Sequence, residues 1–474
     1  MMMDSADDVP VAFSGIFVNM HKGMTDVFGT HLLHLLADSD KMALAACSKD
    51  TRHLFEYNTS IPDASPHFVG VSIERNVRLS DEYDGIPSMC YRDVTVVSAS
   101  TMALTCSMPF IRRLTIDCND EQVVTFLMRE FDWGQLSQLT HITFGSNNLS
   151  LPRNNFNQPL GALAFPPSII SVTFGVCYGH PLDEVVWPRG LRFFEVGDYY
   201  NHSLDSLPDS TERMIIGDGF NQSFARFPLS LTYLMLGRAY NQSFVSVLSW
   251  PRNLQTLIFI GGAYNFPIYM LPSTITYLHL STCYNQPIDV LPASLVDLIL
   301  GLFYNLPIDQ VQWPVGLRTL RFMRGRFNHP LVGLPDSLVE IDVGDGFDHT
   351  VEVLPPNTRR LVLGNGHTGS LSVLPPGLQS LVVGSGYTMD LALINLPAGM
   401  VTLTLTCLVV MDLSRLRLPP SVKVLRIGTA SRHRISLSHL PSTLEEISFR
   451  HAYIYFDELL AKSKISNQLR ITTW

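Results

Sequence analysis

A short sequence recurs about every twenty residues through most of this chain, and this repeat constrains the fold more than any other feature. Residues 264–308 contain three copies of its first part, YNFPI, YNQPI and YNLPI, which begin at Tyr264, Tyr284 and Tyr304. A second anchor, an apolar residue followed by proline, recurs in phase with the first. A fixed period of this size predicts a solenoid, because one unit alone cannot bury its apolar face whereas a stack of units can.

The two anchors place the repeat array at residues 151–450. The aromatic–asparagine corner begins at Phe156-Asn157 and recurs as far as Phe327-Asn328, with Gly179 in place of asparagine in one unit. The corner loses its asparagine from Asp348 onward, where an interruption of its contacts is expected, and the apolar–proline anchor continues to Leu440-Pro441. We therefore expect the array to occupy about two thirds of the chain.

Each unit predicts one short strand and one corner. Leu298 and Leu300 lie two residues apart, so both point from a strand into the core, and Gly301 ends that strand where a sharp turn needs a permissive backbone. The corner aromatic is expected to fill the interior, and the asparagine beside it has donors and an acceptor for the backbone of neighbouring turns. The asparagines predicted to form this structural ladder are Asn157, Asn201, Asn221, Asn241, Asn265, Asn285, Asn305 and Asn328.

Stacked units of this kind would place their strands in one parallel sheet along the solenoid. Few residues separate the two anchors, so the convex side has no room for helices of ordinary length. The corner Tyr264-Asn265-Phe266-Pro267-Ile268 and the Leu-Pro-x-x-Leu-x-x-Leu-x-Leu-Gly strand resemble the FNIP repeat, a leucine-rich-repeat-like family. The expected fold class is a repeat solenoid, a leucine-rich-repeat-like stack of short parallel β-strands with an irregular convex side, preceded by a small helical segment.

That helical segment is expected at residues 26–60. Its leucines predict one short amphipathic helix, and Asp38 or Ser39 can cap a second. The pattern resembles a degenerate F-box, the element that links adaptors to a cullin-type ubiquitin ligase, although Val27-Phe28 replaces the usual opening Leu-Pro. The resemblance implies docking to a Skp-type linker protein, and the alternative is a plain helical cap. The docking residues under the first interpretation are Leu32, Leu35, Leu36 and Leu44.

Less regular segments flank the array on both sides. Residues 1–25 are expected to be a tail, and residues 61–150 to be longer leucine-rich-type units that begin the sheet and cap it. Residues 451–474 are expected to cap the far edge, because an uncovered sheet edge pairs with other chains. Within these segments the sequence predicts strands at 94–97, 111–116, 141–144 and 469–474, and helices at 121–131 and 456–464.

The composition excludes several classes of protein. With 474 residues, 46% of them hydrophobic, the chain can bury a large core and is not disordered. A net charge of −9 without any basic cluster argues against nucleic acid as the main ligand. The seven cysteines are scattered without a C-x-x-C pair, which favours a reducing compartment. No secretory signal and no membrane-spanning run is present, so we expect a cytoplasmic or nuclear protein without a membrane partner.

Neither a catalytic motif nor a metal motif is found in the sequence. It contains no G-x-S-x-G elbow, P-loop or H-E-x-x-H, so no enzymatic activity, cofactor or metal is expected. Two Gly-Asp-Gly segments lack the further oxygen ligands of a calcium loop. Histidines occupy equivalent positions in adjacent units at His180 and His202, and again at His329 and His349. Two ligands are fewer than a transition metal usually needs, so we interpret these histidines as a polar row beside the corner.

The outward positions of the strands form the candidate recognition surface. In a solenoid these positions vary while the core is fixed. Between residues 193 and 299 they are largely aromatic and aliphatic, and charged residues follow, which is typical of a protein-binding surface. The alternative is that such residues only reflect strand preference or lie under N-terminal segments. The predicted contact residues are Phe193, Ile215, Tyr233, Met235, Ile258, Tyr277, His279, Ile299, Arg321 and Arg360.

These features predict a non-catalytic protein-interaction repeat protein, with the F-box resemblance implying a substrate adaptor of a cullin-type ubiquitin ligase. The alternative is a repeat scaffold without a ubiquitin role, whose N-terminal helices only cap the solenoid. A secreted bacterial leucine-rich-repeat ubiquitin ligase would need a catalytic cysteine domain, and the residues after the array contain no cysteine.

Overall fold

The described part of the chain divides into two compact units. The computed structural model describes residues 77–79, 93–96, 111–129, 133–145, 156–247, 249–351, 354–388, 394–406, 416–428, 440–449 and 469–473. Contacts between residues separate Met1–Gly217 (unit 1) from Asp218–Trp474 (unit 2). The predicted helices at 26–60 and 456–464 lie outside the described residues. Within those residues, none of the helices has the length and apolar character needed to cross a membrane.

Unit 1 is a parallel sheet whose strands pair in chain order. The predicted strands at 94–97, 111–116 and 141–144 and the helix at 121–131 are confirmed, with boundaries shifted by one or two residues. The side chain of Asp120 accepts the backbone N–H of Gln122 at 2.9 Å and so caps this helix. The elements are β1 (Val77–Leu79), β2 (Asp93–Val96), β3 (Arg113–Ile116), α6 (Glu121–Arg129), η5 (Trp133–Leu136), β4 (His141–Phe144), β5 (Ser171–Phe174), β6 (Phe193–Val196) and β7 (Arg213–Ile216).

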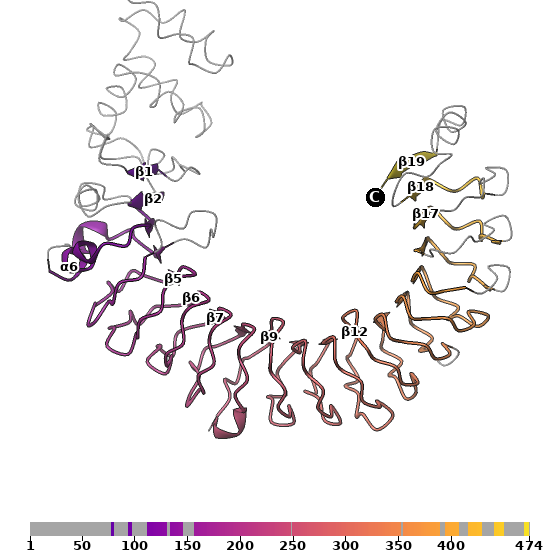
Figure 1. Cartoon of the computed structure of the whole chain (residues 1–474), viewed down its shortest axis with the longest axis horizontal. Helices are drawn as coiled ribbons and strands as arrows, with labels where there is room; N and C mark the ends of the chain where they lie inside the picture. The colour runs from indigo at the N-terminus through magenta and orange to yellow at the C-terminus, as the bar shows by residue number, and fades with distance from the viewer. Residues whose placement is uncertain are drawn as a thin grey trace, which may run out of the picture. The chain divides into compact units, whose positions relative to one another are not determined.

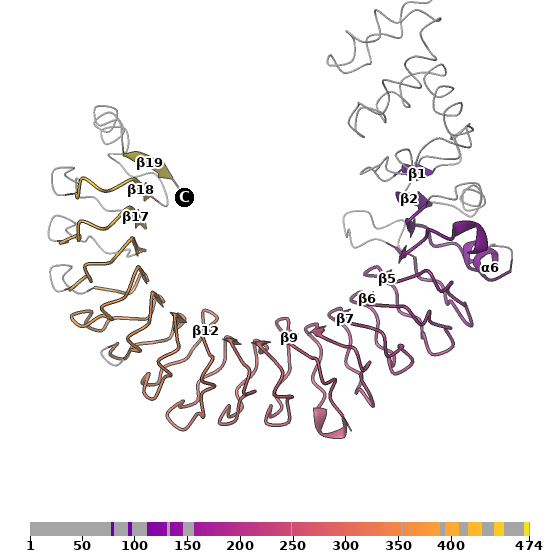
Figure 2. The same ribbon diagram turned by 180° about the vertical axis from the view of Figure 1, so that it is seen from behind.

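Unit 2 continues the same pattern, with each strand parallel to the next in the chain. Within each unit the strands lie on one side and the connecting loops on the other (Figures 1 and 2). The elements of unit 2 are β8 (Tyr233–Leu236), η6 (Phe244–Ser246), β9 (Thr256–Phe259), β10 (Tyr277–His279), β11 (Asp297–Leu300), β12 (Thr319–Phe322), β13 (Glu340–Asp342), β14 (Arg360–Leu363), β15 (Ser380–Val383), β16 (Thr402–Leu405), β17 (Val424–Ile427), β18 (Glu446–Phe449) and β19 (Arg470–Thr473). Helix is scarce among the described residues, as the short spacing between the anchors predicts.

The core of unit 2 is a column of corner aromatics beside the inward side chains of the strands. Tyr264, Tyr284 and Tyr304 are 0% exposed, which confirms that the corner aromatic fills the interior. Their neighbouring ring centroids lie 6.4 and 6.3 Å apart, with interplanar angles of 6° and 8°. Buried aromatic rings contribute a large apolar area, and this parallel arrangement lets identical units repeat without a change in packing. The column continues through Phe327, Phe347, His367 and Tyr387.

The proline anchor sets the approach to each strand. The backbone N–H of Leu295 bonds the carbonyl of Pro292 at 3.1 Å, and Leu317 and Leu338 repeat this turn on their own prolines. Proline fits here because it fixes its own backbone angle. Since it lies outside the strand, its missing N–H removes no hydrogen bond from the sheet. At the end of β11 a Cβ on Gly301 would overlap the carbonyl oxygen of Ser281, so the close approach of consecutive units requires glycine.

Candidate functional site

Two rows of outward side chains cover the strands of unit 2. The strand register aligns Tyr233 with Thr256 and Tyr277 in the first row, and Met235 with Ile258 in the second. We call the outward residues of β8–β15 the sheet face. The predicted contact residues that it brings together are Tyr233, Met235, Ile258, Tyr277, His279, Ile299, Arg321 and Arg360.

The first section of the sheet face, on β8–β11, is apolar and partly shielded from solvent. Tyr233, Tyr277 and His279 are half-buried, and the Tyr233 hydroxyl donates to Sδ of Met235 at 3.6 Å. Burial lowers the pKa of His279, so its ring is neutral at neutral pH and adds no charge here. Ile299 is only 6% exposed, so it supports its neighbours and offers little area for contact.

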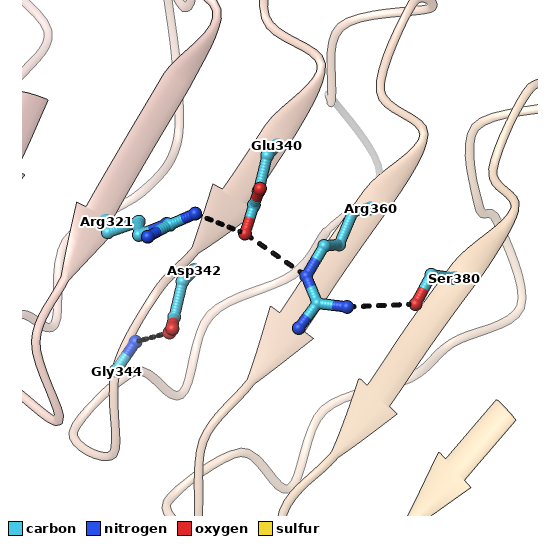
Figure 3. Close-up of polar contacts among 6 residues, drawn as sticks. All are labelled: Arg321, Glu340, Asp342, Gly344, Arg360 and Ser380. Atoms are coloured by element: carbon cyan, nitrogen blue, oxygen red, sulfur yellow. Dashed lines mark hydrogen bonds and ion pairs between the residues drawn. The ribbon is translucent and has the colours of Figure 1, made fainter. Parts of the chain in front are cut away.

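The second section, on β12–β15, is ionic and internally ordered (Figure 3). One carboxylate oxygen of Glu340 bonds Nη2 of Arg321 and Nε of Arg360, each at 3.1 Å. Arg360 also donates from Nη1 to the hydroxyl of Ser380 at 3.3 Å. These contacts hold both guanidinium groups against the sheet in a fixed orientation.

Asp342 lies beside this ion-pair network on β13. Burial raises the pKa of its carboxyl, and the backbone N–H of Gly344 and the nearby Arg321 guanidinium oppose the shift. The bond from the Gly344 N–H to the carboxylate is 3.0 Å (Figure 3). Burial raises the pKa of the Tyr277 hydroxyl, and Arg321 opposes this rise. The charge of the ionic section therefore acts on the apolar section beside it.

Phe193 and Ile215 lie on unit 1. Both are half-buried outward residues, on β6 and β7 respectively. Phe193 pairs in register with Arg213, and Ile215 with Glu195. These apolar positions of unit 1 are therefore each set beside a charged residue, as Tyr277 of unit 2 is beside Asp297.

Corner asparagines connect successive units through their side-chain oxygens. Oδ1 of Asn285 accepts the backbone N–H of Asn305 at 2.9 Å, and Oδ1 of Asn265 accepts that of Asn285 at 2.9 Å. Asn157 makes the same bond to Gly179, which has no side-chain acceptor of its own. The corner bonds made by Asn221, Asn241, Asn305 and Asn328 measure 2.9, 3.2, 2.9 and 2.9 Å, and Asn201 is an exposed corner residue of unit 1.

This row of bonds continues past the last corner asparagine, contrary to the expected interruption. Oδ1 of Asp348 accepts both the backbone N–H and the hydroxyl of Thr368 at 2.8 Å. These hydrogen bonds lower the pKa of the Asp348 carboxyl, so it stays charged at neutral pH. The position needs only an acceptor oxygen, which aspartate supplies as well as asparagine does.

A second row of side-chain bonds, which the sequence analysis missed, lies where the strands end. Oδ1 of Asp345 accepts the backbone N–H of Asn365 at 2.9 Å, and Oδ1 of Asn365 accepts that of Ser385 at 3.0 Å. Asp218 bonds the N–H of Arg238 at 3.2 Å and forms an ion pair with its guanidinium. The signal in the sequence is the polar residue that directly follows a strand-ending glycine. The aspartates of both Gly-Asp-Gly segments, at 217–219 and 344–346, therefore bond the next unit.

The paired histidines use a ring nitrogen within the solenoid. Nε2 of His329 and of His349 lies 3.1 Å from a corner carbonyl of the preceding unit, and His180 and His202 make the same contact at 3.0 and 2.9 Å. No group of three or more metal-ligating side chains occurs among the described residues. This geometry supports the interpretation of a polar row.

The F-box-like residues Leu32, Leu35, Leu36 and Leu44 lie outside the described residues, so their contacts stay a prediction.

Comparison with known proteins agrees with the geometry of the units. The model of the FNIP Repeat family matches one part of the array. The matched residues are 264–303. No curated protein matches the sequence. The match to FNIP repeats lies in the segment with the most regular corners, where three consecutive units contain Tyr-Asn-x-Pro-Ile.

The repeat array is similar in fold to a solved leucine-rich-repeat structure. CroV588, described as a circular LRR protein, superimposes with a TM-score of 0.51 at 23% identity over 76% of this chain. The match covers 60% of CroV588, so this chain spans less than two thirds of its length. YopM from Yersinia enterocolitica WA-314 has a TM-score of 0.43 at 18% identity, covering 72% of this chain and 78% of YopM. An internalin (inlF) from Listeria monocytogenes has a TM-score of 0.38 at 13% identity, covering 73% and 89%.

Proposed function

We propose that this protein is a non-catalytic interaction protein and that the sheet face of unit 2 binds a partner protein. The observation that carries the proposal is the apolar section, where Tyr233, Tyr277 and Ile258 lie half-exposed beside two pre-ordered arginines. Aromatic residues and arginine are the types that contribute most to binding at protein interfaces. A repeat fold supports this use, because it varies its outward residues without disturbing the core.

The test compares proteins that copurify with the full chain and with a Tyr233→Ala/Tyr277→Ala variant, isolated from cells that express the protein. The variant is expected to lose a partner that the wild type retains, with an unchanged circular dichroism spectrum. Tyr269→Ala is a matched control, because Tyr269 is a 63% exposed tyrosine in the loop that follows the Tyr264 corner. Equal recovery of every partner by all three proteins would contradict the proposal.

We further propose that residues 26–60 link this partner to a cullin-type ubiquitin ligase. The support is the sequence pattern around Leu35 and Leu36, which resembles an F-box. Under this proposal the protein acts in the cytoplasm or nucleus, and the free thiols of Cys118, Cys177 and Cys283 are consistent with a reducing compartment.

A direct binding assay between the full chain and a purified Skp-type linker distinguishes the adaptor hypothesis from the scaffold hypothesis. The full chain should bind the linker, and Leu35→Asp/Leu36→Asp should abolish binding without unfolding the repeats. Val315→Asp introduces one aspartate at a 90% exposed position and should leave binding intact. A folded full chain that fails to bind would favour the scaffold, and deletion of residues 26–60 should then destabilise the array.

A further inference from the structure

Two units of the array depart from the repeat where their strands end. After β11, three residues (301–303) separate the last core residue of the strand from the next corner aromatic. Four residues separate them after β9 (260–263) and after β12 (323–326). We call these two longer turns the exit loops. Figure 1 shows the chain looping out beside the labels β9 and β12.

Each exit loop begins with a large apolar side chain where the other units have a small residue. Ile260 is 37% exposed and Met323 is 48% exposed, whereas Ser281 and Gly301 occupy this position on the two strands between them. The backbone N–H groups of Ile260 and Met323 still bond the preceding strand, to Leu236 at 2.8 Å and to Leu300 at 3.0 Å. The alternation of the strands therefore continues, and both side chains project from the same face as the outward rows.

The loop after β12 holds an arginine in a costly conformation. Arg324 has φ 41°, and it is the only non-glycine residue with a positive φ in the described part of the chain. A left-handed backbone is sterically unfavourable for an L-residue because its Cβ approaches the following carbonyl oxygen, a clash that glycine avoids. Such strain is typically retained where a side chain has a use beyond the fold.

The same loop carries a second arginine. The guanidinium of Arg326 lies 4.7 Å from the ring centroid of Phe303, which is half-buried on the neighbouring turn. Backbone bonds from Arg326 to Leu302 at 2.8 Å and from Phe303 to Thr282 at 3.0 Å hold these turns side by side. With exposed Cys283, these side chains form what we call the exit patch, defined as Ile260, Cys283, Phe303, Met323, Arg324 and Arg326.

The exit patch has a net positive charge without acidic residues of its own. The turns at 260–263, 281–283, 301–303 and 323–326 contain Arg324 and Arg326 and no aspartate or glutamate. Among the described carboxylates nearby, Glu340 pairs with Arg321 and Asp218 with Arg238. Asp345 lies on the next turn, which bonds the exit loop through Gly346 and Gly325, and its carboxylate accepts the backbone N–H of Asn365. Adjacent strands are about 4.8 Å apart, so Ile260 and Met323 bracket roughly 14 Å, a span that suits a short peptide segment.

We propose that the exit patch binds a peptide segment of a partner protein in which bulky apolar side chains are flanked by carboxylates. The apolar side chains contact Ile260, Phe303 and Met323, and the carboxylates pair with Arg324 and Arg326. Charge complementarity indicates an acidic partner segment, because guanidinium groups are positively charged and carboxylates bind them in a bidentate manner. This inference rests on the proposed function and names the kind of partner segment that unit 2 recognises.

Selection from a library of random twelve-residue peptides displayed on phage, against the immobilised full chain, tests the proposal. The enriched peptides should combine an aromatic or large aliphatic residue with aspartate or glutamate. Fluorescence anisotropy of the best peptide should show at least tenfold weaker binding to Arg324→Glu/Arg326→Glu, and a similar loss for Met323→Ser. The matched control is Arg318→Glu/Arg359→Glu, which reverses two exposed charges just before strands β12 and β14 and should bind normally.

A second selection on Arg324→Glu/Arg326→Glu adds a readout that a misfolded variant cannot produce. It should enrich peptides with lysine or arginine in place of the acidic residues. The inference is overturned if no peptide is enriched on the wild-type chain, if the enriched peptides lack acidic residues, or if the charge reversal leaves their affinity unchanged. Peptides that depend on Tyr233 and Tyr277 but not on the exit patch would overturn this inference and leave the proposed function standing.

Discussion

Replacement of His367 by phenylalanine should stabilise this protein, and increasingly so as the pH falls. His367 occupies the corner-aromatic position of its unit, 0% exposed, with ring centroids 5.9 Å from Phe347 and 6.3 Å from Tyr387. Neither of its ring nitrogens makes a hydrogen bond of good geometry, although the backbone of Gly369 lies close enough to oppose the fall in its pKa. A buried polar group without a partner costs about 1–3 kcal/mol, and the column accepts phenylalanine, as Phe347 shows. We therefore expect His367→Phe to raise the free energy of unfolding by about 1–3 kcal/mol at pH 7.5.

The pH dependence follows from the protonation of the same ring. Burial lowers the pKa of His367 below its ordinary 6.5, with the nearby Asp348 carboxylate opposing the shift. Below pH 6.5 the unfolded chain binds a proton that the folded chain does not, so wild-type stability falls as the pH falls toward the folded pKa. One pH unit corresponds to 1.36 kcal/mol, so the advantage of His367→Phe should grow by up to about 2 kcal/mol between pH 6.5 and pH 5.

Urea denaturation at pH 7.5, 6.5, 5.5 and 5.0, followed by circular dichroism, measures this difference. Comparison of the two proteins removes the contributions of other histidines, such as His141 and His279, whose pKa burial also lowers. His329→Gln is the control, because Gln242 shows that glutamine can make the equivalent bond to a corner carbonyl. A His367→Phe protein with unchanged or lower stability, or with an advantage independent of pH, would refute the reasoning.

Three further changes test the solenoid and its ion pairs. Asn285→Ala should lower stability by about 0.5–1.5 kcal/mol through the lost bond to the Asn305 N–H, whereas Asn285→Asp should cost less, as measured by urea titration. Tyr304→Phe should leave the thermal midpoint unchanged or raise it, because its buried hydroxyl has no partner, whereas Tyr284→Phe loses a bond to a carbonyl and should lower it. Glu340→Gln should lower stability by less than about 1 kcal/mol, and 0.5 M salt should abolish the difference, since the ion pairs it breaks with Arg321 and Arg360 are partly exposed.

The repeat period was sufficient to predict the fold. The in-phase corner and proline anchors gave the strand positions, because each anchor has one physical role that recurs without change in every unit. The spacing of Leu298 and Leu300 gave the inward side of the strand, and both are fully buried. The corner tyrosines were predictable for the same reason, since a large apolar residue at a fixed position in a stack must be inside.

The features that the sequence analysis missed lie where units differ from one another. Each exit loop has one extra residue, after β9 or after β12. Because the repeat length varies from 20 to 23 residues, one extra residue leaves the corner and proline anchors recognisable and does not stand out. The bonds from Asp345 and Asn365 depend on which backbone N–H the next unit brings near, which follows from the register and not from composition. Ile299 was predicted to contact a partner, yet it is 6% exposed, and burial at an outward strand position depends on the neighbouring strands and not on the repeat pattern.

Photo-crosslinking from the sheet face tests the central claim most directly. A benzoylphenylalanine placed at Tyr277 in the full chain, irradiated in an extract of cells that express the protein, should form a discrete adduct with one partner protein. The same group at Tyr269, an exposed tyrosine in the loop after the Tyr264 corner, should not form that adduct. An adduct from Tyr269 alone, or none from Tyr277 in a correctly folded chain, would contradict the assignment of partner binding to the sheet face.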